Sequence, residues 1–204
     1  MSLPQAVCDA ADVSAVTQLI LRERDSRDLG RWDEMRTCYH PDAQVRVSWF
    51  HGSATDFIKG SIDMASRMVN RHRLSPIRVE LSGKRAFASF AAIVEIPTKL
   101  HEIEMVLLIY ARFIYRAEKR NNQWKVVYFD SVYLRDELTA AIPGRFVSID
   151  PHELKEFRTS YRLLSYVLSQ HGYTIRSDLP GEDRPETVQA LMREVFTWAG
   201  TNVG

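Results

Sequence analysis

The sequence predicts an α+β fold in which a cone-shaped, curved antiparallel sheet wraps around N-terminal helices and a helical extension follows at the C-terminus. Three observations predict it. Apolar residues recur at helical spacing in three segments before residue 70, alternating apolar segments joined by turn signals follow as far as residue 134, and amphipathic helical patterns return after residue 150. Helices followed by a long meander of strands are typical of helices packed on one face of a sheet.

Length and composition are those of an ordinary globular protein. The 204 residues are 45% hydrophobic, which is enough for the core of one domain with an appendage. The 27 basic and 26 acidic residues nearly cancel, so the overall charge favours neither nucleic acid nor an anionic membrane as a partner. The first residues lack a signal-peptide pattern, the longest apolar run, "MVLLIYA", is too short to span a bilayer, and the two cysteines have no disulfide or metal spacing. We therefore expect a cytoplasmic protein.

The first helix is predicted to run from Asp9 or Asp12, either of which can cap it, to about Arg27. Its apolar stripe consists of Val13, Val16, Leu19 and Ile20. Glu23 continues this stripe although it is charged. The sequence leaves three interpretations of Glu23 open: a second carboxylate of a site, a salt-bridge partner of Arg27, or an exposed side chain.

Two further helices flank a short strand. The second helix is predicted over "RWDEMRTCYH" and stops at Pro41. The segment "AQVRVSWF" (43–50) alternates and predicts a strand. The third helix is predicted from Ser53, which has capping-box spacing to Asp56, and ends just before residue 70.

Strands fill the middle of the chain. They are predicted over residues 77–81, 85–96, 104–116 and 124–134. "SGK" turns the chain between the first two of these strands, Pro97 is expected to start a loop, and "KRNN" predicts a hairpin between the last two.

One of these strands indicates that something covers the sheet. Residues 105–115 are apolar at both parities, so the C-terminal tail or a partner subunit must cover the second face. The tail supplies its own helices, the first predicted from the capped "DPHE" at 150–153 to Gly172 and the second after the linker "DLPGEDRP". We divide the chain into a cone domain, 1–142, and a helical extension, 143–204, that packs on the cone or on a partner. A homodimer is expected.

The stretch "VNRHRLSP" places His72 between two arginines. Strand neighbours point to opposite faces, so Arg71 and Arg73 can face outward while His72 faces a pocket. The element order permits the end of the first helix and the start of this strand to meet at the open mouth of such a cone, which would bring Asp28 and His72 together from opposite sides of one pocket. At a separation of about 4 Å and an effective dielectric near 20, Asp28 would favour the imidazolium by roughly 4 kcal/mol, more than either arginine opposes it.

The parity of the strand sets a condition on this pairing. Ile77, Val79 and Leu81 form the apolar parity, and His72 lies on the other one. His72 therefore faces the core only if the register shifts between the two segments, and Pro76 makes a bulge or break there plausible.

Four stretches in this order resemble the SnoaL-like branch of the nuclear-transport-factor-2-like superfamily over residues 13–137. They are "RDLGRWDEMRTCYHPDA", "HGSATDFI", "RHRLSPIRVELSGKRAFA" and "ARFIYRAEKRNNQWKVV". The resemblance implies a cone with a deep pocket. In the scytalone dehydratase and hexachlorocyclohexane dehydrochlorinase relatives, an aspartate four residues before a Trp-like position pairs with a histidine that opens a strand. These positions are Asp28, Trp32 and His72 here, which implies that His72 is a general base oriented by Asp28.

Two positions depart from that pattern. The relatives usually carry Tyr or Lys five residues before the aspartate, where this chain has Glu23. They often carry an arginine five residues after the tryptophan of the last strand, and here Trp124 is followed at that distance by Phe129. The resemblance therefore implies the fold and the pair, and it does not assign any one relative's reaction.

Core side chains line the pocket in this fold, so large ones are candidates for contacting a substrate together with Glu23. They are Trp32, Tyr39, Trp49, Phe50, Met68, Phe90, Tyr110 and Phe113. "HEIE" at 101–104 lacks the second histidine of a zinc motif, and the sequence has no phosphate loop, nucleotide fingerprint or nucleophile elbow. No metal and no cofactor are expected.

The function expected from these residues is that of a cofactor-independent lyase or isomerase. The substrate would be a small apolar molecule, aromatic or polycyclic, and the reaction a dehydration, a dehydrohalogenation or a related proton shift. Two other classes stay open: a small-molecule-binding protein without catalysis, and a structural subunit like the small chains of ring-hydroxylating dioxygenases.

Overall fold

The structure is a computed structural model and describes residues 4–200. Its helices are α1 (Gln5–Asp28), α2 (Trp32–Thr37), α3 (Ala54–Ala65), the short 3-10 helix η1 (Thr159–Tyr161), α4 (Arg162–Gln170) and α5 (Pro185–Ala199). Its strands are β1 (Tyr39–Val47), β2 (Phe50–Ser53), β3 (Arg71–Leu74), β4 (Arg78–Ser82), β5 (Arg85–Leu100), β6 (Ile103–Arg120) and β7 (Gln123–Ala140). The predicted α+β class is confirmed.

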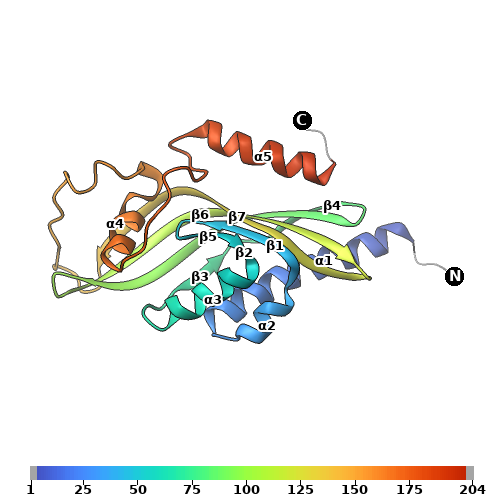
Figure 1. Cartoon of the computed structure of the whole chain (residues 1–204), viewed down its shortest axis with the longest axis horizontal. Coiled ribbons are helices and arrows are strands. Elements are labelled where there is room, and N and C mark those ends of the chain that lie inside the picture. The colour runs from blue at the N-terminus through green and yellow to red at the C-terminus, as the bar shows by residue number, and fades with distance from the viewer. Residues whose placement is uncertain (1–3, 201–204) are drawn as a thin grey trace.

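The strands form one seven-stranded sheet in the order β2-β1-β7-β6-β5-β3, and β4 also pairs with β5. All pairs are antiparallel except one, because β1 runs parallel to β7. The sheet is therefore mixed, and the expectation of an antiparallel sheet is corrected at this pair. α1 and α2 precede β1 in the chain and lie on one face of the sheet (Figure 1).

The helices cover the sheet on both faces. Figure 1 shows α1, α2 and α3 together below the sheet, α5 above it, and α4 near the end at which β5 turns into β6. The largest core cluster lies between the first three helices and the inner sheet face, a second includes α4, and a third joins α5 to the outer face. Within residues 4–200, no helix has both the length and the apolar character needed to cross a membrane.

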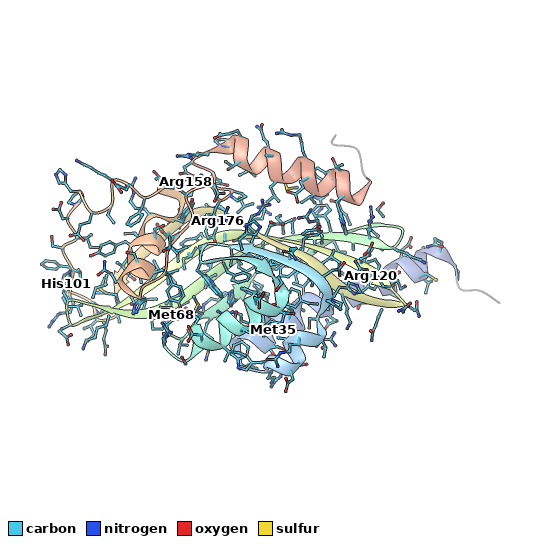
Figure 2. The ribbon with its side chains drawn as sticks, viewed as in Figure 1. Met35, Met68, His101, Arg120, Arg158 and Arg176 are labelled. Atoms are coloured by element: carbon cyan, nitrogen blue, oxygen red, sulfur yellow. The ribbon has the colours of Figure 1, made fainter. Side chains whose placement is uncertain are left out.

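Two tight hairpins end the long strands. His101 and Glu102 have φ angles of 47° and 63°, and Asn121 and Asn122 have φ angles of 49° and 58°. Both pairs are two-residue loops whose left-handed conformation matches the strand twist. Figure 2 labels His101 and Arg120 close to these turns, at opposite sides of the molecule. The "KRNN" hairpin is thus confirmed.

The loop expected at Pro97 is wrong. β5 continues through Pro97, which lies opposite Val106 of β6, and the turn comes four residues later at His101. Proline lacks an N–H donor but tolerates a strand position that does not need one. The true turn carries neither glycine nor asparagine, so the sequence does not mark it.

The N-terminal helices differ at their ends from the prediction. α1 begins at Gln5, so Asp12 is not a cap. Asp12 instead accepts hydrogen bonds from Nζ of Lys119 at 2.7 Å and from Nε1 of Trp124 at 2.9 Å, which ties α1 to β6 and β7. Gly30, whose φ is 69°, follows the end of α1 in the left-handed conformation that glycine adopts readily. Tyr39 belongs to β1 rather than to the second helix.

The C-terminal segment is helical over less of its length than predicted. "DPHE" makes only a turn, in which Asp150 Oδ1 accepts the N–H of His152. Arg158 has extended backbone and is held by the Asp183 carboxylate and by the Leu179 carbonyl, so a helix cannot run through it. Figure 2 shows Arg158 between the two C-terminal segments that these bonds connect. The division into 1–142 and 143–204 stays a prediction.

Both faces of the strand at 105–115 acquire cover from the tail. Leu107 and Ile109 are buried in the cluster that contains α4, and Ile114 on the other parity is buried against α5. Val106, Leu108 and Tyr110 remain only half-buried. The expectation that the tail covers the strand therefore holds over part of its second face.

Candidate functional site

A cavity lies between the inner sheet face and the helices. Its volume is about 60 Å³, the space within which the centre of a water molecule can move. Alternate residues of the central strands form its floor, as the two-residue period of a strand requires. They are Val94 and Ile96 of β5, Ile109, Ala111 and Phe113 of β6, and Phe129, Ser131 and Tyr133 of β7. His72 of β3 adds to this floor from the sheet edge.

Helices and the end of β1 enclose the rest of the cavity. The residues they supply are Arg24 and Arg27 of α1, Val47, Ser48 and Trp49 at the β1–β2 turn, Phe57 and Met64 of α3, Asn70, and Leu164 and Leu168 of α4. The members on one helix are three, four or seven residues apart, so each set lies on a single helix face. Gly60 of α3 makes room for Trp49, since a Cβ there would lie 2.9 Å from the indole, and Trp49 stacks on Phe57.

His72 and Asp28 meet at the wall of this cavity. Nδ1 of His72 lies 2.6 Å from Oδ1 of Asp28, and Oδ2 of Asp28 accepts the backbone N–H of His72 at 2.7 Å. Because an ionised carboxylate can only accept, Nδ1 must carry the proton, and Nε2 keeps its lone pair. The side chain of His72 is 6% exposed and that of Asp28 is 12% exposed. A surface cleft lined by both residues lies on the outer side of the pair.

The register shift required for His72 to face the core is present. Leu74 of β3 lies opposite Ala92 of β5, and Arg78 of β4 lies opposite Ser89. Four steps along one strand therefore oppose three along the other, which places one extra residue between β3 and β4 and changes the parity. His72 and Val79 consequently face the same side of the sheet.

The neighbouring arginines face outward, as the sequence predicts. Arg73 is exposed and pairs with Glu95, while Arg71 is exposed and donates to the main-chain oxygen of Asp28 at 2.9 Å. Arg71 thus connects the end of α1 to the start of β3. Of the three residues 71–73, only His72 lines the cavity.

The expected protonation state of His72 is corrected. Burial lowers the pKa of His72 to about 4, and the cations Arg24 and Arg27 contribute in the same direction against the hydrogen bond to Asp28. Loss of hydration thus exceeds the attraction of Asp28, and the ring is neutral near pH 7. Burial alone would raise the pKa of Asp28, but the hydrogen bonds from His72 and the charge of Arg24 lower it below its ordinary value.

Glu23 is a fully buried partner of Arg24, not of Arg27. Its two carboxylate oxygens accept both arms of the Arg24 guanidinium and the hydroxyls of Tyr39 at 2.7 Å and Tyr115 at 2.8 Å. Burial alone would raise the pKa of Glu23, but the Arg24 charge and these hydrogen bonds lower it. The Arg24 guanidinium lies 4.8 Å from the centre of the Phe129 ring. Glu23 therefore does not line the cavity itself, but its ion pair fixes the position of Arg24, which does.

The structure brings only some of the predicted pocket residues to the cavity. Trp49 and Phe113 line it together with His72. The other predicted substrate contacts do not: these are Glu23, Trp32, Tyr39, Phe50, Met68, Phe90 and Tyr110.

The reasons are positional. Tyr39 binds Glu23, Phe90 packs between Phe113 and Tyr115, and Phe50 lies against the rings of Trp49 and Phe57. Trp32 packs on the core from α2, beside Gly30, and Met68 is buried in the cluster that contains α4. Tyr110 is on the outer sheet face, where its hydroxyl donates to Glu137 at 3.0 Å.

Sequence reasoning missed the polar residues that line the cavity. They are Arg24, Arg27, Ser48, Asn70, Ser131 and Tyr133. A signal for the arginines existed, because Val16, Ile20, Glu23 and Arg27 continue one stripe at spacings of three and four residues. Among residues 4–200, no three His, Cys, Asp or Glu side chains gather as a metal site would require.

Comparison with known proteins identifies a matching family and solved structures with a similar fold. A family model described as a SnoaL-like domain matches residues 9–130. A PEP2-like protein of Fusarium vanettenii is 26% identical over 163 residues, which cover 78% of this chain and 70% of the relative. A hexachlorocyclohexane dehydrochlorinase of Novosphingobium barchaimii has a TM-score of 0.55 and 18% identity, and the match covers 71% of this chain and 99% of that one. A scytalone dehydratase-like protein of Novosphingobium aromaticivorans has a TM-score of 0.55 and 14% identity, covering 68% and 97%.

Proposed function

The chain belongs to the SnoaL-like domain family, and from this premise we propose that it is a cofactor-independent lyase or isomerase whose general base is His72. One observation carries the proposal. The 2.6 Å contact between Nδ1 of His72 and the Asp28 carboxylate lies at the wall of a cavity that is otherwise largely apolar. The same contact is what a base fixed in one tautomer requires.

The proton chemistry follows from the tautomer. Asp28 accepts the Nδ1 proton, so the lone pair of Nε2 is available to take a proton from a carbon of the substrate. In an elimination, the electron pair of that C–H bond becomes the new double bond, and the bond to the leaving group breaks on the neighbouring carbon, so that a halide departs as the anion and a hydroxyl departs as water with the proton that the imidazolium returns. In an isomerisation, the imidazolium returns its proton to another carbon. Asp28 balances the positive ring in both cases.

Burial of the pair suits this role. A neutral ring at pH 7 is ready to accept a proton, and the charge of Asp28 stabilises the imidazolium only once it forms. The surface cleft on the outer side of the pair gives the proton a short path to water after the reaction. The dehydrochlorinase among the structural neighbours supports the reaction class.

The size of the cavity restricts the substrate. Extended by the 1.4 Å radius of water, a sphere of the observed space has a total volume on the order of 200 Å³, and a dry cavity of about 150 Å³ binds benzene. One substituted ring therefore fits, and a polycyclic molecule does not fit without movement of the lining. We propose a single-ring substrate.

The pH dependence of turnover tests the base. With a pKa of about 4 for His72, kcat/KM should stay level from about pH 8 down to about pH 5, halve near pH 4, and fall tenfold per pH unit only below that. An ordinary histidine would already halve the rate near pH 6.5. The measurement is a pH–rate profile on single-ring alcohols and halides that the wild type converts. Circular dichroism at each pH is the control, because protonation of the unfolded chain below about pH 6.5 lowers stability as well.

The alternatives predict different behaviour in the same screen. A binding protein would take up ring compounds without converting any, and a structural subunit would require a larger partner for stability. The buried, tautomer-fixed His72 favours the enzyme over both, since neither alternative needs a free Nε2. The homodimer and the cytoplasmic location remain predictions. The half-buried Val106, Leu108 and Tyr110 of the outer sheet face offer the surface on which a second copy would pack.

A further inference from the structure

Arg27 is the exception among the buried arginines of the described chain. Four arginine side chains in residues 4–200 are buried: Arg24, Arg27, Arg116 and Arg158. Three of them have a carboxylate partner, namely Glu23, Asp130 and Asp183 respectively. Within the same residues, no carboxylate oxygen lies within 4.0 Å of the guanidinium of Arg27. Burying a charge without a direct partner is costly, so its position calls for an explanation.

The single hydrogen bond of the Arg27 side chain in residues 4–200 is weak. Nη2 of Arg27 donates to the thioether sulfur of Met64 at 3.6 Å, and a thioether is a poor acceptor. Asp28, the nearest acid in sequence, is engaged by the ring and backbone of His72, and Glu23 is engaged by Arg24 and two tyrosines. Arg27 is 5% exposed and is one of the residues that line the cavity, and within residues 4–200 its Nε and Nη1 have no hydrogen-bond acceptor.

The side chain of Asn70 contacts the same methionine as Arg27. Its Nδ2 donates to the same Met64 sulfur at 3.3 Å, so the amide and the guanidinium converge on one atom. Asn70 is buried and lines the cavity, and its Oδ1 has no hydrogen-bond partner among the described residues. Arg27 and Asn70 therefore meet at Met64 in a cavity whose remaining walls are mostly apolar, and of the two only Arg27 has donors left for an anion, since the free atom of Asn70 is an acceptor.

We propose, resting on the proposed function, that Arg27 forms an anion subsite and that the substrate is a single-ring carboxylic acid. A carboxylate presents two coplanar oxygens that match the guanidinium fork. One negative charge balances Arg27, the one buried arginine of residues 4–200 that has no carboxylate partner. The ring of the acid occupies the apolar part of the cavity, beside Phe113 and Trp49, and thereby comes to the wall that carries His72. Arg27 thus selects the substrate and fixes its orientation toward the base.

Benzoate and benzamide test the subsite, because they share a ring and differ in charge. Isothermal titration of the wild type should show benzoate binding at least tenfold more tightly than benzamide. Arg27→Met and Arg27→Gln should each remove this preference. Arg36→Met, the same change at an exposed arginine of α2, is the matched control and should keep it. Benzamide bound as tightly as benzoate, benzoate bound equally by the Arg27 variants, or no binding of benzoate by the wild type would each overturn the proposal.

Stability separates a binding role from a structural one. Since Arg27→Met replaces a buried, unpaired charge with an apolar chain of similar length, the melting temperature of the empty protein should stay level or rise. A marked fall would show that Arg27 supports the fold instead. His72→Gln should keep the benzoate preference. A wild type that binds benzoate through Arg27 but converts no acid would refute the proposed function alone, whereas turnover that ignores Arg27 would refute the subsite alone.

Discussion

Replacing His72 with alanine is expected to lower kcat/KM for a converted substrate by about 10²- to 10⁴-fold, the usual contribution of a general base. The loss should appear in kcat, because Nε2 acts on the reacting carbon and not on the bound ring. The fold should persist, since His72 lies at the end of the short edge strand β3 and its ring is one contact among many around Phe113. Steady-state kinetics with circular dichroism measures both quantities.

The matched control for this prediction is His171→Ala, which removes an exposed imidazole at the end of α4. That variant should keep wild-type turnover. Asp28→Asn should resemble His72→Ala more closely than the control, because an amide can present a donor to Nδ1 and no longer fixes the tautomer. Full activity in His72→Ala would show that His72 is not the general base. An unfolded His72→Ala would show that the histidine is structural.

Replacing Glu23 with glutamine is expected to lower the free energy of unfolding by about 3–5 kcal/mol, since it leaves Arg24 buried without its counter-ion. The side chain of Glu23 is fully buried, and its oxygens accept from Arg24 and two tyrosine hydroxyls. An amide nitrogen in place of one oxygen would turn a donor toward groups that themselves donate. Denaturation by urea, followed by tryptophan fluorescence, measures the change.

A double-mutant cycle makes this second prediction specific. Arg24→Met combined with Glu23→Gln should be less destabilised than the sum of the two single changes, because the pair is buried and neither member is then left charged alone. Glu34→Gln on α2, where the carboxylate is partly exposed and makes only a 3.8 Å surface pair with Arg31, provides the control and should change stability by less than about 0.5 kcal/mol. Additive effects of Glu23→Gln and Arg24→Met would mean that the two side chains are not coupled.

The sequence predicts where the site lies better than it predicts which residues line it and how they are protonated. Element order permitted Asp28 and His72 to lie near one another, the resemblance to SnoaL-like relatives singled out the pair, and the shift near Pro76 met the condition on parity. The contact joins residues 44 positions apart, so no local pattern of the sequence records it. The protonation state of His72 could not be predicted from the sequence, because it depends on how deeply the ring is buried. Burial lowers the pKa of His72 by more than Asp28 raises it.

The pocket residues show the limit most clearly. Aromatic side chains such as Tyr39 and Phe90 were expected at the cavity on size, yet they fill the layer behind it. Arg24 and Arg27 were not expected there, since a cation on a buried helix face is explicable only by its partners, and these come from distant strands or from a ligand. The predicted helix at 150–158 failed for a similar reason, because the long-range pairing of Arg158 with Asp183 overrides the local cap of "DPHE".

Catalysis by His72 requires a neutral ring with a protonated Nδ1 and a free Nε2. Nitrogen NMR of the histidine ring, recorded on the wild type from pH 7.5 down to the onset of unfolding, reports the protonation of each ring nitrogen. We expect the His72 signals to show a protonated Nδ1 and an unprotonated Nε2 throughout, with titration only near pH 4. A ring that titrates near pH 6.5, or one with the proton on Nε2, would contradict the proposed base.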